Sequence, residues 1–319
     1  MKKKLLTLAV AAALPLAAQA ANAEVTIYGK IHASIDYVDY DASDSQWDVT
    51  SRASRLGFKG SEDLGNGLKL IWKLESGIDV TGSDNGGGSL SARNRYIGLA
   101  GGWGTFLYGI HDTPMKMSTG KLDIFVDTIT DYNATTGLVD IRAKDAIAYV
   151  SPSFGGLTLV GAIVPDGDFD GDGDFAGAYS LAAMYSNGGL YLSAAYESLD
   201  DLVGGADASH WRIGAGFDMG AFHIGGVFAD QDDFTGGNVY TINGSWTFGN
   251  NAVKAMWGRT EDDNRNGGDD SDSWAIGLDH NFSKRSKAYI IYADSDANLN
   301  YTNYSGEQSG FSMGMVHKF

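Results

Sequence analysis

The sequence contains no cysteine, only four prolines and, after residue 23, no apolar run long enough to cross a bilayer as a helix, which takes about 18 residues. Without cysteine, no disulfide can hold the fold and no thiolate can act as a nucleophile or metal ligand. The scarcity of proline argues against a proline-rich linker. The missing apolar run leaves a membrane β-barrel open, because strands of about ten residues give only a weak hydropathy signal.

The first 23 residues form a segment of a different kind. They begin with three lysines, continue with an apolar middle and end in the A-x-A pattern Ala21-Asn22-Ala23. This pattern predicts a secretory signal peptide over residues 1–23, cleaved before Glu24. A transmembrane anchor is disfavoured because the apolar run is short and the cleavage pattern is present. Removal of the lysines makes a chain of net charge −17 still more acidic.

The segment 24–37, EVTIYGKIHASIDY, alternates apolar and polar residues over its whole length. Val25, Ile27 and Ile31 fall on one face, and Lys30 and Asp36 fall on the other. A period of two predicts a strand, and no helix has this period. Similar alternation recurs in segments 211–218, 240–248 and 274–279. With 44 glycines, 16 tyrosines and 14 phenylalanines, the composition suits many strands joined by tight turns.

The connections between these segments alternate between short and long. Short turns are expected at 63–67, 100–104, 151–156, 186–189, 218–221, 248–251 and 281–286. Longer, Asp-rich loops are expected at 38–51, 81–91, 113–140, 165–176, 199–208, 230–236, 261–271 and 297–306. This alternation predicts an all-β fold of 16 antiparallel strands with all short turns at one end. Such a sheet closes into a barrel to remove its edges, and in lipid it has to close.

Aromatic residues gather where strands meet turns, as the interfacial girdles of a membrane barrel do. Those expected in the girdles are Tyr28, Trp72, Trp103, Tyr149, Tyr191, Trp246 and Trp257. Together with the polar inward faces, they favour a transmembrane β-barrel over a soluble sandwich.

Three motifs carry a resemblance to a known family. The stretches SRLGFKGSEDLGNGLKLIWKLE, RNRYIGLAGGWGTFLYG and SPSFGGL, with the terminal aromatic of GMVHKF, resemble the general diffusion porins of the Gram-negative outer membrane. The similarity covers residues 24–319 as one porin β-barrel domain. It implies a 16-stranded barrel, a homotrimer, and a third loop folded inward to narrow the pore.

The resemblance also implies which arginines line the pore. Arg55 holds the position of the arginine in SRLGFKG, Arg93 that of the arginine two residues before R-Y-I-G-L, and Arg142 that of the arginine that opens RAKDAIAYVSP; we expect Arg95 on the same face as Arg93. The period of two adds Lys30, Lys59 and Lys73 to this inward, basic side. An arginine on the lipid face would cost roughly 2–4 kcal/mol at the bilayer midplane.

The loop 113–140 is the candidate constriction because it is long and unusually apolar for an exposed loop. Asp123, Asp127 and Asp131 are spaced four apart, which would align them on one face of a helical turn. Facing the arginines, they would set a transverse field across the opening. The alternative is that they are solvated loop residues.

Asp168, Asp170 and Asp172 match the opening of an EF-hand loop, but Tyr179 stands where the glutamate is needed. We therefore expect weak Ca²⁺ or Mg²⁺ binding at most, and otherwise no cofactor. The histidines have no metal-ligand spacing, and no G-x-S-x-G motif is present.

The sequence thus predicts an outer-membrane porin for passive diffusion of ions and small hydrophilic solutes, and not an enzyme. Its expected partners are outer-membrane lipid, those solutes and two further copies of the chain. Nucleic acid is disfavoured because the basic residues face inward. A substrate-specific channel, and more remotely a barrel enzyme, remain as alternatives. The charges on the two sides predict only weak net ion selectivity, drifting toward cations as salt is diluted.

Overall fold

The computed structural model describes residues 24–41, 43–82, 90–165, 175–203, 206–234, 236–264, 267–297, 299 and 306–319. Within these residues the chain is almost entirely β-sheet. The two short helices, α1 (Pro114–Thr119) and α2 (Tyr132–Thr135), lie in the same connection between strands. The expected calcium-binding aspartates Asp168, Asp170 and Asp172 lie outside the described residues.

All strands belong to one antiparallel sheet. In chain order they are β1 (Glu24–Tyr40), β2 (Ser43–Ser51), β3 (Arg55–Gly65), β4 (Leu68–Gly77), β5 (Ser91–Gly101), β6 (Gly104–Asp112), β7 (Arg142–Val150), β8 (Leu157–Val164), β9 (Ala178–Asn187), β10 (Leu190–Val203), β11 (Ala206–Met219), β12 (Phe222–Asp230), β13 (Asn238–Phe248), β14 (Asn251–Asp263), β15 (Asp269–Asn281), β16 (Ser286–Ser295) and β17 (Gln308–Lys318).

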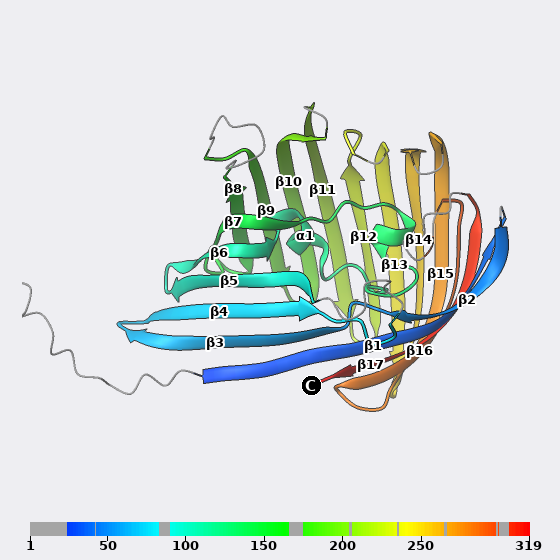
Figure 1. Cartoon of the computed structure of the whole chain (residues 1–319), viewed down its shortest axis with the longest axis horizontal. Helices are drawn as coiled ribbons and strands as arrows, with labels where there is room; N and C mark the ends of the chain where they lie inside the picture. Colours follow the sequence, from blue (N-terminus) through cyan, green and yellow to red (C-terminus); the bar gives the residue numbers. More distant parts are fainter. Residues whose placement is uncertain are drawn as a thin grey trace, which may run out of the picture.

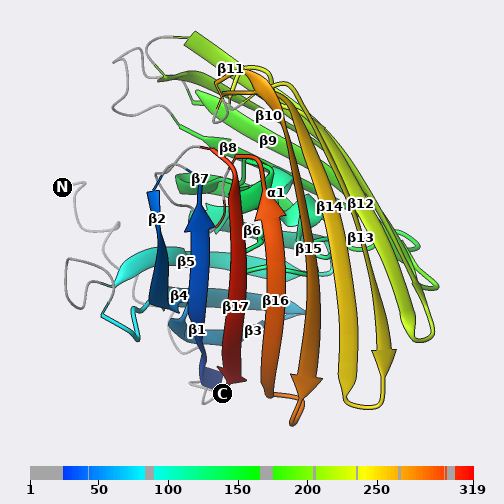
Figure 2. The same ribbon diagram turned by 90° about the vertical axis from the view of Figure 1, so that its right-hand side faces the viewer.

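The sheet closes on itself because β1 pairs with β17 along one edge, from Lys30–Lys318 to Tyr40–Gln308. Along its other edge β1 pairs first with β3 and then with β2. The segments β2 and β3 therefore occupy one position in the wall, and the barrel has 16 strands, as predicted. Figure 1 shows the near wall, β3 to β6, crossing in front of the far wall, β9 to β14, and Figure 2 shows β1 beside β17.

Three of the expected loops are shorter than the sequence indicated, and in one of them, 261–271, β14 runs to Asp263 and β15 begins at Asp269. Residues 43–51 form β2, which pairs with the C-terminal half of β1, so most of the expected loop 38–51 is strand. Similarly, β10 runs to Val203 and β11 begins at Ala206, inside the expected loop 199–208. The Asp-rich composition of these segments concealed their strand character, because cross-strand pairing outweighs the low intrinsic strand preference of aspartate.

The two faces of the wall follow the period of two. On β1, Ile27 is 61% exposed on the outside, whereas Asp36 on the inward face is 1% exposed. The apolar residues therefore face outward and the polar residues face the lumen. This reversal of the usual soluble pattern is what a wall between lipid and water requires.

Aromatic side chains form outward-facing groups near both ends of the strands. Near the short turns, Trp103 stacks on Tyr149 and Phe222 on Trp246. Near the longer loops, Trp274 packs against Tyr292. The prediction was wrong for two tyrosines, which face the lumen: the Tyr28 hydroxyl donates to Glu75, and the Tyr191 hydroxyl donates to the carbonyl of Ser118.

The connection between β6 and β7, residues 113–141, folds into the barrel, and we call it the inner loop. Figure 1 shows α1, which belongs to it, inside the ring of strands. Neither α1 nor α2, the helices of the described residues, has the length or apolar character to cross a membrane.

Candidate functional site

Apolar side chains of the inner loop fill sockets in the far wall of the barrel. Leu122, Phe125 and Ile129 are fully buried. Each lies against a lumen-facing glycine of the wall. A Cβ atom on Gly216 would lie 2.8 Å from a Leu122 methyl group, and one on Gly277 would lie 3.0 Å from the Phe125 ring. Because glycine has no side chain, these wall positions leave room for the apolar side chains of the inner loop.

Wall side chains also bind the backbone of the inner loop. Side chains of β10, β11, β13 and β14, and Gln231 directly after β12, donate to six of its carbonyl oxygens: Tyr191 Oη to Ser118, Asn243 Nδ2 to Leu122, Lys254 Nζ to Ile124, Thr260 Oγ1 to Thr136, Gln231 Nε2 to Gly137 and Arg212 Nη2 to Val139, over 2.6–3.0 Å. Buried backbone carbonyls are costly when unpaired, and these bonds satisfy six of them. The inner loop is thus a fixed part of the lumen.

Local capping shapes the loop itself. Thr113 accepts a hydrogen bond from the amide of Lys116 at the start of α1, where Pro114 follows it. Asp131 caps α2 by accepting from the amide of Asn133 over 3.0 Å. Both are residue types that helix N-termini favour.

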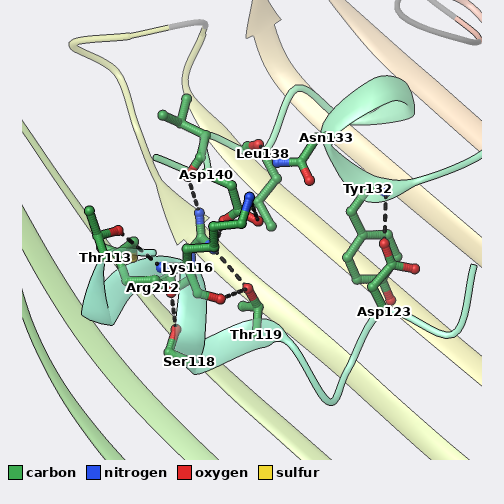
Figure 3. A network of polar contacts seen from close by, with 12 residues as sticks. Thr113, Lys116, Ser118, Thr119, Asp123, Tyr132, Asn133, Leu138, Asp140 and Arg212 are labelled. Carbon is green, nitrogen blue, oxygen red and sulfur yellow. Dashed lines mark hydrogen bonds and ion pairs between the residues drawn. The ribbon is translucent and has the colours of Figure 1, made fainter. Parts of the chain in front are cut away.

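The three loop aspartates do not share one helical face, because residues 121–131 form turns and not a helix. Asp123 accepts from the amides of Phe125 and Tyr132, over 2.7 and 3.1 Å, and Figure 3 shows it beside the Tyr132 ring. Asp131 accepts from the amide of Asp127 in addition to capping α2. Asp123 and Asp131 therefore hold the turns together, and Asp127 is the one of the three that reaches the opposite wall.

The surroundings of Asp123 and Asp127 differ accordingly. Burial, with a contribution from the nearby Asp131 carboxylate, raises the pKa of Asp123 well above its usual range. Burial alone would also raise the pKa of Asp127, but the Lys30 ammonium outweighs it and lowers the pKa of Asp127 below its usual value. Asp127 is therefore the more firmly ionised of the two at neutral pH.

Asp127 faces the first residues of a basic wall, by which we mean Lys30 on β1, Arg55 on β3, Arg93 on β5 and Arg142 on β7. Its Oδ2 atom pairs with Lys30 Nζ and lies 3.9 Å from Arg55 Nη1. Lys30 and Arg55 are direct partners in the register of β1 and β3. The tip of the inner loop is thus tied across the lumen to the near wall.

Glu75, on β4, neutralises part of the positive charge on this side of the lumen. It pairs with Arg93 Nε over 2.8 Å and with Lys73 Nζ over 3.4 Å. The Tyr28 ring lies between Lys59 and Lys73, whose Nζ atoms are 5.4 and 5.7 Å from its centroid. Lys59 and Lys73 therefore face the lumen as expected, but they gather around Tyr28 and not around the inner loop.

An open cavity between the inner loop and the near wall collects most of the predicted residues. Its charged lining residues are Arg55, Arg93, Lys116, Arg142, Asp112, Asp123, Asp127, Asp131 and Asp140. Arg142 Nε pairs with Asp112 over 2.9 Å and donates to Asn94 over 3.0 Å. We call this cavity the passage; its basic groups lie on β3, β5 and β7 and its acidic groups mainly on the inner loop, which is the arrangement that the sequence predicted for the constriction.

Arg95 is not part of this cavity. The regular register of β4 and β5 places Arg95 opposite Leu74, which faces outward, and an irregularity between Leu74 and Ser76 then shifts the pairing on the Arg93 side by one residue. Arg95 donates to Ser76 Oγ over 2.7 Å and to the carbonyl of Glu75 over 3.1 Å. The expectation that Arg93 and Arg95 share a face is therefore wrong, since an irregularity in the ladder shifts the alternation by one residue.

Sequence reasoning missed Arg212 of β11, which lies in the far wall behind the inner loop and is fully buried. Its Nη1 atom lies 2.8 Å from Asp140 Oδ1 and 3.0 Å from Thr119 Oγ1 (Figure 3). Its place on the polar phase of segment 211–218 could have indicated an inward arginine. The described residues hold no group of three or more acidic or histidine side chains suited to a metal ion.

Comparison with known proteins places this geometry in context. The family described as Gram-negative porin matches residues 7–300. The major outer membrane protein P.IB of Neisseria meningitidis serogroup B is 28% identical over 313 residues, which cover 91% of this chain and 92% of that protein. The P.IB protein of Neisseria gonorrhoeae is 35% identical over 173 residues, covering 50% of this chain and 47% of that protein.

Solved structures agree with these sequence relatives. The anion-selective porin from Comamonas acidovorans superimposes with a TM-score of 0.79 at 26% identity, covering 93% of this chain and all of that one. A variant of the Rh. blastica porin shares the fold, with a TM-score of 0.69 at 19% identity over 93% of this chain. The family consists of channels and not of enzymes. This chain therefore belongs to the Gram-negative porins, and its lumen is an outer-membrane diffusion channel.

Proposed function

We propose that this channel passes ions and small hydrophilic solutes without a dedicated substrate site, and that the inner loop and the basic wall set its ion selectivity. One observation carries the proposal: Asp127 faces Lys30 and Arg55 across a cavity that Arg93 and Arg142 also line. Opposite charges on opposite sides of a narrow, partly dry passage produce a transverse field that acts on every passing dipole.

The balance of charge in the passage supports weak net selectivity. Four basic and five acidic side chains line the cavity, and the raised pKa of Asp123 makes its ionisation less complete. The related Comamonas porin is described as anion-selective, which favours the basic side as the stronger influence. We therefore propose that anions are slightly preferred at high salt, where the acidic outer loops are screened within about 3 Å, and that cations gain as salt is diluted.

The experiment is a bilayer recording of reversal potentials with the triple variant Arg55→Gln, Arg93→Gln, Arg142→Gln. At about 1 M salt, removal of three positive charges should shift the reversal potential toward cations. An unchanged reversal potential would show that these arginines do not control the passage. Current that saturates at low concentration of one solute would instead favour a substrate-specific channel.

We further propose that the chain assembles as a homotrimer. A structural neighbour of the same fold, OmpT of Vibrio cholerae, is described in a trimer form. Gly29 on β1, whose lack of a side chain would allow close approach of another subunit, is covered by the Phe319 ring of the same chain. We therefore expect subunit contacts elsewhere on the outer face. Migration of the unheated, detergent-solubilised protein only as a monomer would contradict the proposal.

We propose that export removes residues 1–23, on the ground of the lysines, the apolar middle and the A-x-A pattern of this segment. Mass spectrometry of protein purified from outer membranes should give Glu24 as the first residue. We also propose that no cofactor is required and that Asp168, Asp170 and Asp172 bind Ca²⁺ or Mg²⁺ weakly at most. Calorimetric titration of the wild type and of Asp170→Asn with Ca²⁺ would test this, and tight binding in the wild type that the variant loses would contradict it.

A further inference from the structure

Arg212 connects two parts of the inner loop that are far apart along the loop. Nη1 donates to Thr119 Oγ1 at the end of α1, over 3.0 Å, and Nη2 donates to the carbonyl of Val139, where the loop returns to the wall, over 2.6 Å. A guanidinium presents its nitrogens as a rigid planar fork, so one side chain can hold both places at once. Arg212 on β11 therefore links the end of α1 to the last part of the inner loop.

Arg212 also pairs with a carboxylate that lines the passage. Asp140 Oδ1 lies 2.8 Å from Arg212 Nη1, and Asp140 Oδ2 lies 4.0 Å from Lys116 Nζ. Asp140 and Lys116 line the cavity, whereas Arg212 does not and is fully buried. Figure 3 shows Arg212 beneath Lys116 and Asp140, with Thr119 beside it.

We propose that Arg212 is a positioning residue that determines ion selectivity from outside the passage, by neutralising Asp140 and by fixing the two arms of the inner loop. A buried charge that loses its partner is not screened by water as a surface charge is. Without Arg212, the carboxylate of Asp140 would face the passage with only the more distant Lys116 to compensate it. The passage would then attract cations more strongly and anions less.

The test compares single-channel recordings of Arg212→Met with the wild type at about 1 M salt, where charges outside the lumen are screened. We expect the reversal potential of Arg212→Met to shift toward cations and its open-channel noise to increase. Arg212→Lys keeps the charge without the fork, so it should keep the wild-type reversal potential but show the increased noise. A purely structural role would move the noise in both variants and the reversal potential in neither.

A double variant shows whether the effect passes through Asp140. Asp140→Asn alone should shift the reversal potential toward anions, and Arg212→Met with Asp140→Asn should return it close to that of the wild type. A double variant that stays shifted toward cations would overturn the proposal. If Arg212→Met does not assemble, Arg212→Gln in the same cycle takes its place, because it keeps a polar side chain that can still bind Val139.

The matched control is Arg259→Met. Arg259 also contacts two acceptors, Asp270 at 2.5 Å and Asp272 at 2.9 Å, but on the outer surface of the loop end. It should keep the wild-type reversal potential at this salt concentration.

The inference rests on the proposed function, so Asp127→Asn serves as a reference. If Asp127→Asn shifts the reversal potential and Arg212→Met does not, the inference alone fails, whereas no shift in either refutes the proposed function.

Discussion

At the scale of single residues, the effect of a charged side chain on ion passage depends on which side of the wall it faces. Arg93 and Arg95 are two residues apart in β5, a spacing that normally places side chains on the same face. Yet Arg93 pairs with Glu75 in the lumen, while Arg95 bonds to Ser76 on the outer side. The irregularity between Leu74 and Ser76 separates them.

These two arginines give a matched pair of variants. Arg93→Gln removes a positive charge from the passage, so we expect its reversal potential at high salt to shift toward cations. Arg95→Gln removes the same charge from the outer face, so it should conduct as the wild type does. Bilayer recordings of both variants in the same salt gradient check this, and equal shifts would show that both arginines face the lumen.

Protonation of Asp127 should change the reversal potential of the channel at low pH. Its pKa lies below the usual value because Lys30 outweighs the effect of burial. A carboxyl with a lowered folded-state pKa stabilises its contacts above the unfolded pKa, about 3.9, and loses that contribution as pH falls through the folded value. We therefore expect a shift of the reversal potential toward anions at a pH below the ordinary range of aspartate, as Asp127 becomes neutral.

The measurement is a pH series of reversal potentials at high salt, with Asp127→Asn as the comparison. The variant should already be shifted toward anions at neutral pH and should lack the low-pH step. A step of the same size in the variant would assign it to another carboxyl group.

At the scale of elements, the inner loop is held by the match between its side chains and the glycines of the far wall. A Cβ atom on Gly216 would lie 2.8 Å from Leu122, whereas the next neighbours, His223 and the carbonyl oxygen of Ile224, are 3.7 Å away. The wall also binds loop carbonyl oxygens, which every residue type carries. Docking therefore depends on a few apolar side chains and on the loop backbone, and the contacts of Asp127 with Lys30 and of Asp140 with Arg212 add to it.

Filling one socket should displace the loop. Gly216→Val introduces atoms into the space of Leu122, and such overpacking typically costs about 1–3 kcal/mol. We expect a changed single-channel conductance and greater protease sensitivity of the inner loop. Leu122→Ala combined with Gly216→Val should restore both, because the smaller side chain makes room for the valine.

Gly161→Val is the control for this variant. Gly161 has one flexible neighbour, a Leu181 methyl group at 3.3 Å, and Leu181 faces outward. Its conductance should equal that of the wild type. Wild-type behaviour of Gly216→Val itself would show that Leu122 does not hold the loop.

At the scale of the whole molecule, closure of the barrel depends on the last residue. The amide and carbonyl of Phe319 bond to Gly29, each over 3.1 Å, and the Phe319 ring covers the place where a Gly29 side chain would be. These contacts end the pairing of β1 with β17. The two strands are distant in sequence, so their pairing carries a large loop-closure cost that every contact at the seam helps to offset.

Phe319→Ala should therefore weaken the closed barrel more than it weakens any single hairpin. We expect the band of unfolded protein to appear after heating to a lower temperature, on gels that separate folded from unfolded protein. Phe282→Ala removes the same ring from the turn between β15 and β16, away from the seam, and should change this temperature less. Equal changes would argue against a special role for the seam.

The sequence by itself determined the strands, their faces and the barrel, because a period of two is a local property that each strand carries independently. It also predicted Arg55, Arg93 and Arg142 as constriction residues through the resemblance to porins, and Asp127 through the spacing of the loop aspartates. The tertiary structure decided the loss of Arg95 from the lumen, because an irregularity in the ladder is set by pairing between strands and leaves no pattern in one strand.

Tertiary structure alone also decided how the inner loop is held. The bond from Asn243 to Leu122 joins residues 121 positions apart, and that from Arg212 to Val139 joins residues 73 apart. No local periodicity links such residues, and glycine sockets are visible only when the opposing side chain is in place. Asp123 and Asp131 hold turns while Asp127 crosses the lumen, because the backbone between them makes turns and not the helix that their spacing suggested.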